Sequence, residues 1–90
     1  MKQVILAVRD SKVGSFMRPM FVQSIGQGMR MFGDEVNRKA DDNILYHHPE
    51  DFSLWHFGDF DDSEMPHFDL MPAPEVLVKA VDLRVPDSVR

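Results

Sequence analysis

The stretch that decides the fold is Val4-Ile5-Leu6-Ala7-Val8, a continuous apolar run near the N-terminus. Three of its five residues are β-branched, and runs of this kind are typical of a strand buried on both faces or at the centre of a sheet. A polar turn from Arg9 to Lys12 ends the run. The sequence therefore predicts a buried strand over Val4–Val8, for which the rest of the chain must supply neighbours.

The strongest helix signal begins at Ser24, because Gln27 stands three residues later as its capping-box partner. Apolar side chains then recur at helical spacing, at Ile25, Met29, Phe32 and Val36. The pattern predicts one helix over Ile25–Asn37. Each of its three glycines costs roughly 0.5 to 1 kcal/mol relative to alanine, so the helix must rely on tertiary packing. Glycines at this spacing also allow another part of the chain to approach closely, and both interpretations stay open.

A hairpin is predicted in the second half of the chain. Phe52–Phe57 has the composition of a strand with aromatic residues on both faces, an acidic turn covers residues 58–64, and a returning strand includes Phe68–Met71. Residues 13–21 and 38–50 lack a clean period and are expected to be loops. Residues 74–85 are compatible with both a short helix and a strand, and periodicity does not separate the two.

This order of elements predicts the α+β class. We expect a single small domain over residues 1–90, with a three- or four-stranded antiparallel or mixed sheet and one main helix packed on one face. Ninety residues without cysteine exclude a disulfide-stapled scaffold. The longest apolar run is far below the ~20 residues of a membrane span, and the N-terminus lacks a secretory pattern. We therefore expect a cytoplasmic protein with no membrane partner.

Charge is distributed unevenly along the chain. Residues 1–30 carry five basic side chains and one acidic one, whereas residues 31–75 carry twelve acidic and two basic ones. The net charge of −5 argues against a general DNA-coating protein, because phosphate binding requires lysine and arginine. Any contact with nucleic acid is therefore expected in the basic N-terminal third.

The motifs of catalysis and metal binding are missing from the sequence. The acidic run at Asp59, Asp61, Asp62 and Glu64 does not have the spacing of an EF-hand loop. The four histidines form no helical His-x3-His pair, and there is neither a Gly-x-Ser-x-Gly elbow nor a P-loop. We expect no enzymatic activity, no catalytic residues, no metal and no cofactor.

Basic and aromatic side chains alternate in the N-terminal third, as sequence-tolerant binding of single strands requires. Guanidinium groups follow phosphates, while aromatic rings stack on bases. The competing interpretation places the two phenylalanines in the core, with solvated arginines around them. The candidate nucleic-acid-binding residues are Arg9, Lys12, Phe16, Arg18, Phe21 and Arg30.

Several collinear segments resemble the non-structural, DNA-binding protein of the gokushoviruses, which are Microviridae phages with single-stranded DNA genomes. The similarity covers about two thirds of the chain. Its main pieces are Asp10-Ser11-Lys12, Pro19-Met20-Phe21, His48-Pro49-Glu50-Asp51-Phe52 and Phe57-Gly58-Asp59-Phe60-Asp61. The helix positions Gly26, Arg30, Phe32, Asp34 and Val36-Asn37, together with Leu54-Trp55, complete it.

The resemblance implies a bacteriophage protein that is made in the host bacterial cytoplasm and is absent from the virion. Its expected partners are single-stranded DNA and phage or host replication proteins, during DNA synthesis or packaging. The alternative is a protein–protein adaptor or assembly factor without DNA contact, a homo-oligomer whose charge-polarised surfaces attract one another. The family label supplies no binding residues.

Overall fold

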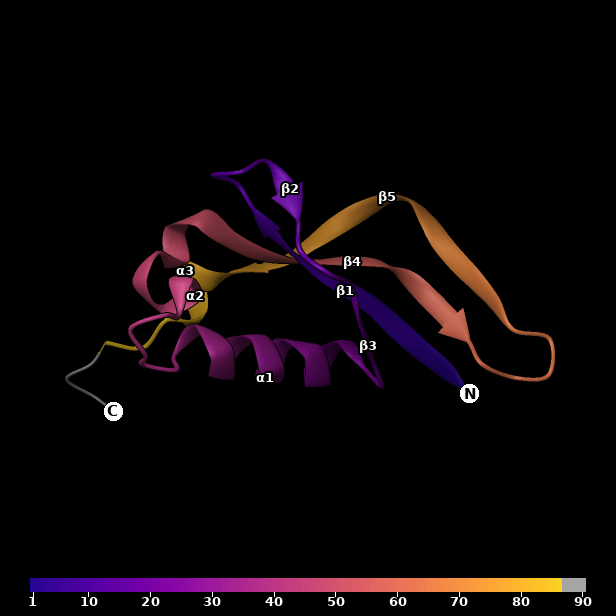
Figure 1. The fold of residues 1–90 in the computed structure, drawn as a ribbon. Coiled ribbons are helices and arrows are strands. Elements are labelled where there is room, and N and C mark those ends of the chain that lie inside the picture. Colours follow the sequence, from indigo (N-terminus) through magenta and orange to yellow (C-terminus); the bar gives the residue numbers. More distant parts are fainter. Residues whose placement is uncertain (87–90) are drawn as a thin grey trace.

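The computed structural model of the chain describes residues 1–86, which form an antiparallel sheet with helices (Figure 1). Its strands, in chain order, are β1 (Lys2–Asp10), β2 (Ser15–Phe16), β3 (Met20–Val22), β4 (Phe52–Asp61) and β5 (His67–Lys79). Strand β1 lies inside the sheet between β4 and the short strands β2 and β3, and β5 forms the outer edge beyond β4. All four pairings are antiparallel. The Val4–Val8 run is therefore central, as its composition predicts.

The helical elements are α1 (Ile25–Val36), α2 (Ile44–His47), the 3-10 helix η1 (Pro49–Asp51) and α3 (Ala80–Leu83). Helix α1 begins where the sequence predicts, because the Ser24 side chain accepts a hydrogen bond from the backbone N–H of Gln27 at 3.0 Å. The Gln27 side chain accepts one in return from the backbone N–H of Gln23 at 2.7 Å. The first bond satisfies one of the N–H groups that lack partners at a helix start, and the second fixes the residue that precedes the cap.

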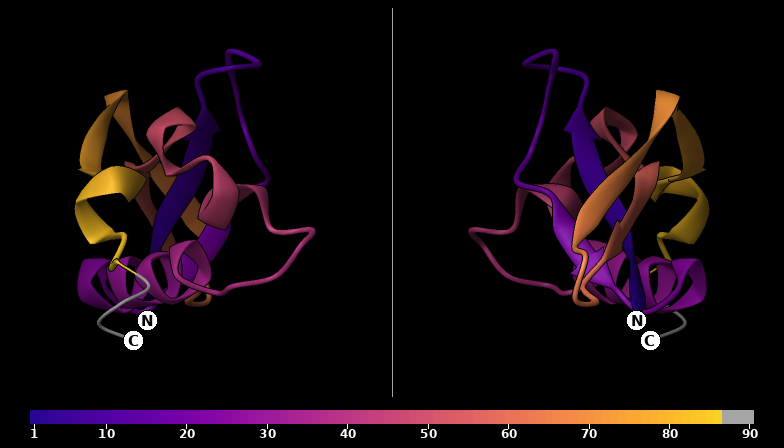
Figure 2. Two further views of the ribbon diagram at one scale, coloured as in Figure 1. Left: turned by 90° about the vertical axis from the view of Figure 1, so that its left-hand side faces the viewer. Right: turned by 90° about the vertical axis from the view of Figure 1, so that its right-hand side faces the viewer.

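The buried core lies on one face of the sheet, which we call the core face. Leu6 and Leu54 from the central strands share one buried cluster with Phe32 and Val36 of α1. The end-on views show α1 on one side of the strands and the β1–β2 turn projecting on the other (Figure 2). Gly28 is needed here, because a Cβ at this position would overlap Cδ1 of the buried Leu6.

Irregular pairing between β4 and β5 bends the sheet. His56 pairs with Glu75 and Gly58 pairs with Leu70, so Phe57 alone stands opposite residues 71–74 of β5. Two of those four residues are prolines, which have no N–H to donate to β4. Gly58 has a φ of +147°, and a Cβ there would overlap the Asp69 carbonyl oxygen. Such bulges increase strand bending and twist.

The structure corrects several sequence expectations. Residues 13–21 are not only a loop, because β2 and β3 within them pair with β1. Residues 38–50 contain α2, and the sheet has five strands with no parallel pairing. The hairpin strands are longer than predicted, so the turn covers only residues 62–66. Residues 74–79 belong to β5 and 80–83 to α3, so both alternatives for this segment occur.

Candidate nucleic-acid interface

The sheet face opposite the core face, which we call the open face, can be derived from the strand register. Directly opposite residues in antiparallel strands project to the same face, and successive residues alternate. Leu6 and Val8 lie in the core, so Ile5, Ala7 and Arg9 project to the open face. Their cross-strand partners there are Phe16 and Phe21 on one side, and Ser53, Trp55 and Gly58 on the other. Strand β5 extends the same cross-strand rows of the open face with Lys79, Val76, Leu70 and Phe68.

Six aromatic rings gather on this face in two groups. Phe16 packs edge-on against Trp55 and Phe57, with centroid distances of 5.8 and 4.9 Å. In the second group, Phe21, Phe60 and Phe68 lie 4.9 to 6.4 Å apart. Edge-to-face contacts in this distance range are favourable, so the rings hold one another in place. The open face is therefore ordered although much of it is in contact with solvent.

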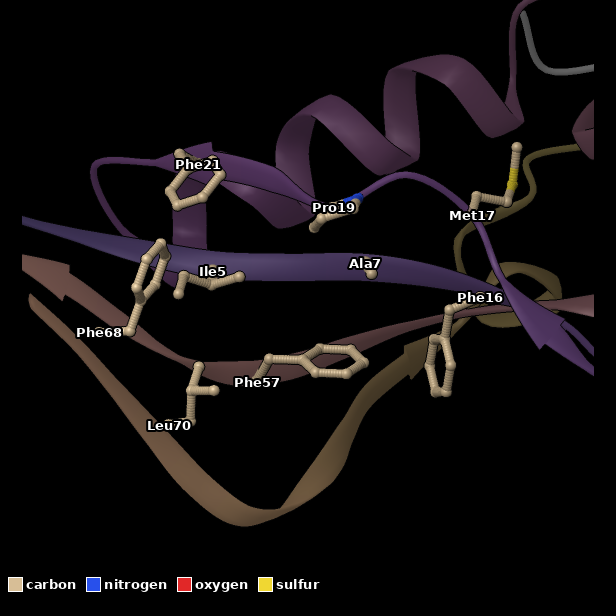
Figure 3. A pocket seen from close by; sticks show the side chains of 9 residues that line it. All are labelled: Ile5, Ala7, Phe16, Met17, Pro19, Phe21, Phe57, Phe68 and Leu70. Atoms are coloured by element: carbon tan, nitrogen blue, oxygen red, sulfur yellow. The ribbon is translucent and has the colours of Figure 1, made fainter.

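Between the two groups lies a hollow that we call the cup, with a volume of about 460 Å³. Its lining is wholly apolar and consists of Ile5, Ala7, Phe16, Met17, Pro19, Phe21, Phe57, Phe68 and Leu70. Figure 3 shows these side chains spread over all five strands, with Met17 and Pro19 in the segment that joins β2 to β3. Gly58 places no side chain in the row between Ile5 and Leu70, which keeps the hollow open. The cup accepts apolar or flat aromatic groups and offers no hydrogen bonds from its side chains.

One end of the open face carries positive charge, and we call it the basic end. Arg9, Ser53 and Lys79 form one cross-strand row next to Trp55, and all four line a second depression. The indole N–H of Trp55 donates to the Ser53 hydroxyl at 2.8 Å, which fixes the ring beside the two cations. Among residues 1–86, neither Arg9 nor Lys79 has an acidic partner within 4.0 Å. Glu50 and Asp51 border the same depression, so the basic end is narrow.

Most acids of the hairpin point away from the open face. Asp59 pairs with Val4, Asp61 with Lys2 and Asp69 with Asp59, which assigns all three to the core-face side. The hydrogen bond from the N-terminal ammonium, followed by one from Gln3, lowers the pKa of the Asp62 carboxyl. Backbone and side-chain hydrogen bonds from Ser63 lower the pKa of Asp61. The hairpin end therefore stays negatively charged at neutral pH, with Asp59, Asp61 and Asp69 on the side away from the aromatic rings and Asp62 beside Gln3, which pairs with Phe60.

The model of the phage ORF5 protein family matches residues 3–83, which is nearly the whole chain. The chain belongs to the phage ORF5 protein family. No curated protein and no solved structure matches it. Family membership makes this a bacteriophage protein, in agreement with the resemblance drawn from the sequence. Among the described residues of this ORF5 protein, no helix is long and apolar enough to cross a membrane.

The six candidate binding residues of the ORF5 chain do not form a single patch. Arg9, Phe16 and Phe21 share the open face, and Lys12 lies in the turn between β1 and β2. Arg18 borders a different depression beside Met31, Phe32 and Glu35, on the side of α1. Arg30 is exposed on α1, and its helical position relative to Phe32 turns it away from the sheet. The structure thus brings together three of the six.

Sequence reasoning missed several residues that complete the open face, above all Trp55, Lys79, Phe60 and Phe68. A partial signal exists in the alternation of Ser53, Trp55 and Phe57, which predicts one face of a strand. The bulge at Phe57 then reverses the alternation, so Phe60 and not Asp59 shares the face of Trp55. Lys79 stands seventy positions after Arg9, and only the sheet register brings them into one row.

Two other groups of polar side chains in the ORF5 chain are less well supported as functional sites. His48, Glu50 and Asp51 have ligand-type atoms within 4.8 Å of one another, yet the first two are exposed and nothing else there points to a cation. On the core face, Nε2 of His56 is buried without a hydrogen bond and lies 3.9 Å from Oδ1 of Asp59. The first group borders the basic end, where Glu50 and Asp51 line the depression of Trp55, and the second lies on the opposite face of the sheet.

Proposed function

We propose that this ORF5-family chain is a non-enzymatic, non-structural gokushovirus protein that binds single-stranded DNA on its open face. In this proposal it acts during phage DNA synthesis or packaging in the host cytoplasm, alone or with replication proteins, and stays outside the virion. The observation that carries the proposal is the row of Arg9 and Lys79 beside Trp55 and the Phe16 group. That combination supplies both contacts that a single strand offers.

Bases supply the first of these contacts. Stacking on an aromatic side chain contributes about 1 to 3 kcal/mol per base and tolerates any sequence, because every base has a π-face. Phe16 is 39 % exposed and Phe21 is 45 % exposed, so both rings present surface to a ligand. The bases of a duplex are already stacked and paired. The open face should therefore prefer single strands.

Phosphates supply the second contact. Arg9 and Lys79, with Lys12 in the adjoining turn, offer two or three cations at one end of the face. Each phosphate neutralised on a single strand contributes about −0.7 to the slope of log affinity against log salt, so a slope of roughly −1.4 to −2.1 is expected. Asp59, Asp61 and Asp69 lie on the core-face side of the sheet, so phosphate binding on the open face is compatible with the net charge of −5.

Fluorescence anisotropy with a labelled single-stranded oligonucleotide across a salt series tests the proposal. The double variant Arg9→Ala/Lys79→Ala should lower the affinity and make the slope shallower by about 1.4, since two phosphate contacts are lost. The matched control is Arg18→Ala/Arg30→Ala, which removes the same charge from outside the open face and should change the slope little. Equal effects of the two double variants would contradict the assignment of the site. No binding at about 50 mM salt, where phosphate contacts are strong, would leave the adaptor as the function.

A further inference from the structure

The cup lies at the centre of a contiguous apolar patch on the open face. Phe68 is 60 % exposed and Leu70 is 61 % exposed, and both stand on the hairpin beside the hollow. Phe16, Met17 and Phe21 add further exposed surface around its rim. Contiguous apolar patches above a few hundred Å² usually mark an interaction site. The cup is therefore expected to be covered by a partner.

The area of the cup matches the centre of an ordinary protein interface. An aromatic side chain buries roughly 150 to 250 Å², so the exposed parts of the five residues together amount to roughly 400 to 500 Å². A standard interface takes about 800 Å² from each partner, of which about 57 to 65 % is apolar, or about 450 to 520 Å². The apolar area of the patch is thus close to the apolar area that one protein contributes to a standard interface.

We infer that the cup is the contact between two copies of this chain, packed open face to open face about a two-fold axis. In such an arrangement the same patch serves both copies, and each contact occurs twice. Phe68 and Leu70 from the hairpin of one copy enter the hollow above Ile5 and Ala7 of the other. Phe68 and Leu70 are the most exposed of the large hydrophobic side chains that line the cup, so they are the ones that reach a second copy.

Charge favours a second copy as the partner. None of the nine residues that line the cup is charged, so identical surfaces meet without opposed like charges. Three acids of the hairpin, Asp59, Asp61 and Asp69, project from the other side of the sheet. A basic partner protein would be expected to meet those acids, which are not on the open face. Strand addition along β5 is disfavoured, because Pro72 and Pro74 interrupt its edge.

The dimer shares Phe16 and Phe21 with the proposed DNA site, because both rings line the cup and a second copy would cover them. Arg9, Lys79 and Trp55 lie outside the lining of the cup, so the basic end of each copy stays accessible in the pair. The contact is apolar and is not weakened by salt, which distinguishes it from the charge-driven oligomer that is the alternative hypothesis from the sequence. Binding of DNA and formation of the dimer therefore respond differently to ionic strength.

Sedimentation equilibrium of the full chain without DNA tests the inference, at concentrations from about 5 to 500 µM and at about 0.1 and 0.5 M NaCl. The expected result is a reversible monomer–dimer equilibrium whose dissociation constant is equal or lower at the higher salt. A monomer at all concentrations would overturn the inference and assign the cup to a different protein. Dissociation by salt would also overturn it, in favour of a charge-driven contact. Because DNA is absent, neither result bears on the proposed function.

The variant Phe68→Asp/Leu70→Asp locates the contact. Both side chains are largely exposed, so the fold should persist, while four carboxylates brought into an apolar interface should raise the dissociation constant about 100-fold or more. Ile44→Asp is the matched control, since Ile44 is an exposed apolar residue on α2 outside the cup, and it should leave the constant within about threefold. Should circular dichroism show that the double variant is unfolded, Phe68→Ser alone replaces it, with a rise of about tenfold expected. A dimer that is unaffected by a folded cup variant would overturn the inference.

Discussion

Gly26 and Gly28 stand two residues apart in α1 and have opposite surroundings. A Cβ at Gly28 would overlap Cδ1 of the fully buried Leu6, whereas a Cβ at Gly26 would meet no side chain of the described residues closer than the Ser24 hydroxyl at 3.9 Å. Gly28→Ala should therefore destabilise the protein by about 1 to 3 kcal/mol through overpacking. Gly26→Ala should stabilise it by about 0.5 to 1 kcal/mol through helix propensity. Urea denaturation of the two variants measures both, and equal effects would contradict the packing of α1 on β1.

Asp62 and the N-terminal amine form an exposed pair with a hydrogen bond of 2.8 Å. This bond lowers the pKa of Asp62 below its ordinary 3.8 and raises the pKa of the amine above 8.0. The contribution of Asp62 to stability is thus present above pH 3.8 and is lost as the pH falls through the lowered pKa. The contribution of the amine is complete below pH 8.0 and is lost as the pH rises through the raised pKa.

Acetylation of the N-terminus tests this pair by NMR titration of the carboxyl groups. Removal of the ammonium should move the pKa of Asp62 upward, toward its ordinary value. Asp61 is the internal control, because hydrogen bonds from Ser63 are the main cause of its lowered pKa, and that pKa should move less. A pKa of Asp62 that does not respond to acetylation would show that the amine is not its partner.

At the scale of the elements, one buried side chain joins α1 to α2. Asn43 is only 3 % exposed, and its Nδ2 donates to the carbonyl oxygens of Glu35 and Arg38 at 2.8 and 2.7 Å. Its Oδ1 accepts from the backbone N–H of Leu45 and caps α2. Asn43→Ala leaves these groups without partners and should destabilise the fold by about 2 to 4 kcal/mol in urea denaturation. Asn43→Asp keeps the acceptor but places a buried carboxylate oxygen against the two carbonyl oxygens, so it should cost at least as much as alanine. A clearly smaller loss with Asp would contradict this account.

The elements that local sequence specifies are those that could be predicted. The Val4–Val8 strand follows from the composition of its own five residues, and the helix start follows from Ser24 and Gln27, which are three positions apart. Strands β2 and β3 have only two and three residues and exist through pairing with β1, so no period reveals them. The same limit applies to the candidate site, because the row of Arg9 and Lys79 arises from long-range register.

For the whole molecule, the distribution of charge and aromatic rings matters more than their totals. The molecule is elongated, with extents of 48 × 26 × 20 Å, and it separates a face of aromatic rings from Asp59, Asp61 and Asp69 of the hairpin. This separation allows an acidic protein to offer a surface for a polyanion. The anisotropy experiment should show an affinity for a single strand at least about tenfold above that for a duplex of equal length, since paired bases cannot stack on the rings. Equal affinities would mean that phosphates alone are recognised.

The most direct test of the open face uses Trp55, the only tryptophan in the chain, which lies beside Arg9 and Lys79. A base stacked on or next to this indole changes its fluorescence, so emission reports contact at the proposed site itself. Titration with an unlabelled single-stranded oligonucleotide at about 50 mM salt should change the emission in a saturable way, with the affinity found by anisotropy. The signal change should be weaker in Arg9→Ala/Lys79→Ala and retained in Arg18→Ala/Arg30→Ala. Binding detected by anisotropy with no change in Trp55 emission would contradict the open face as the DNA-binding surface.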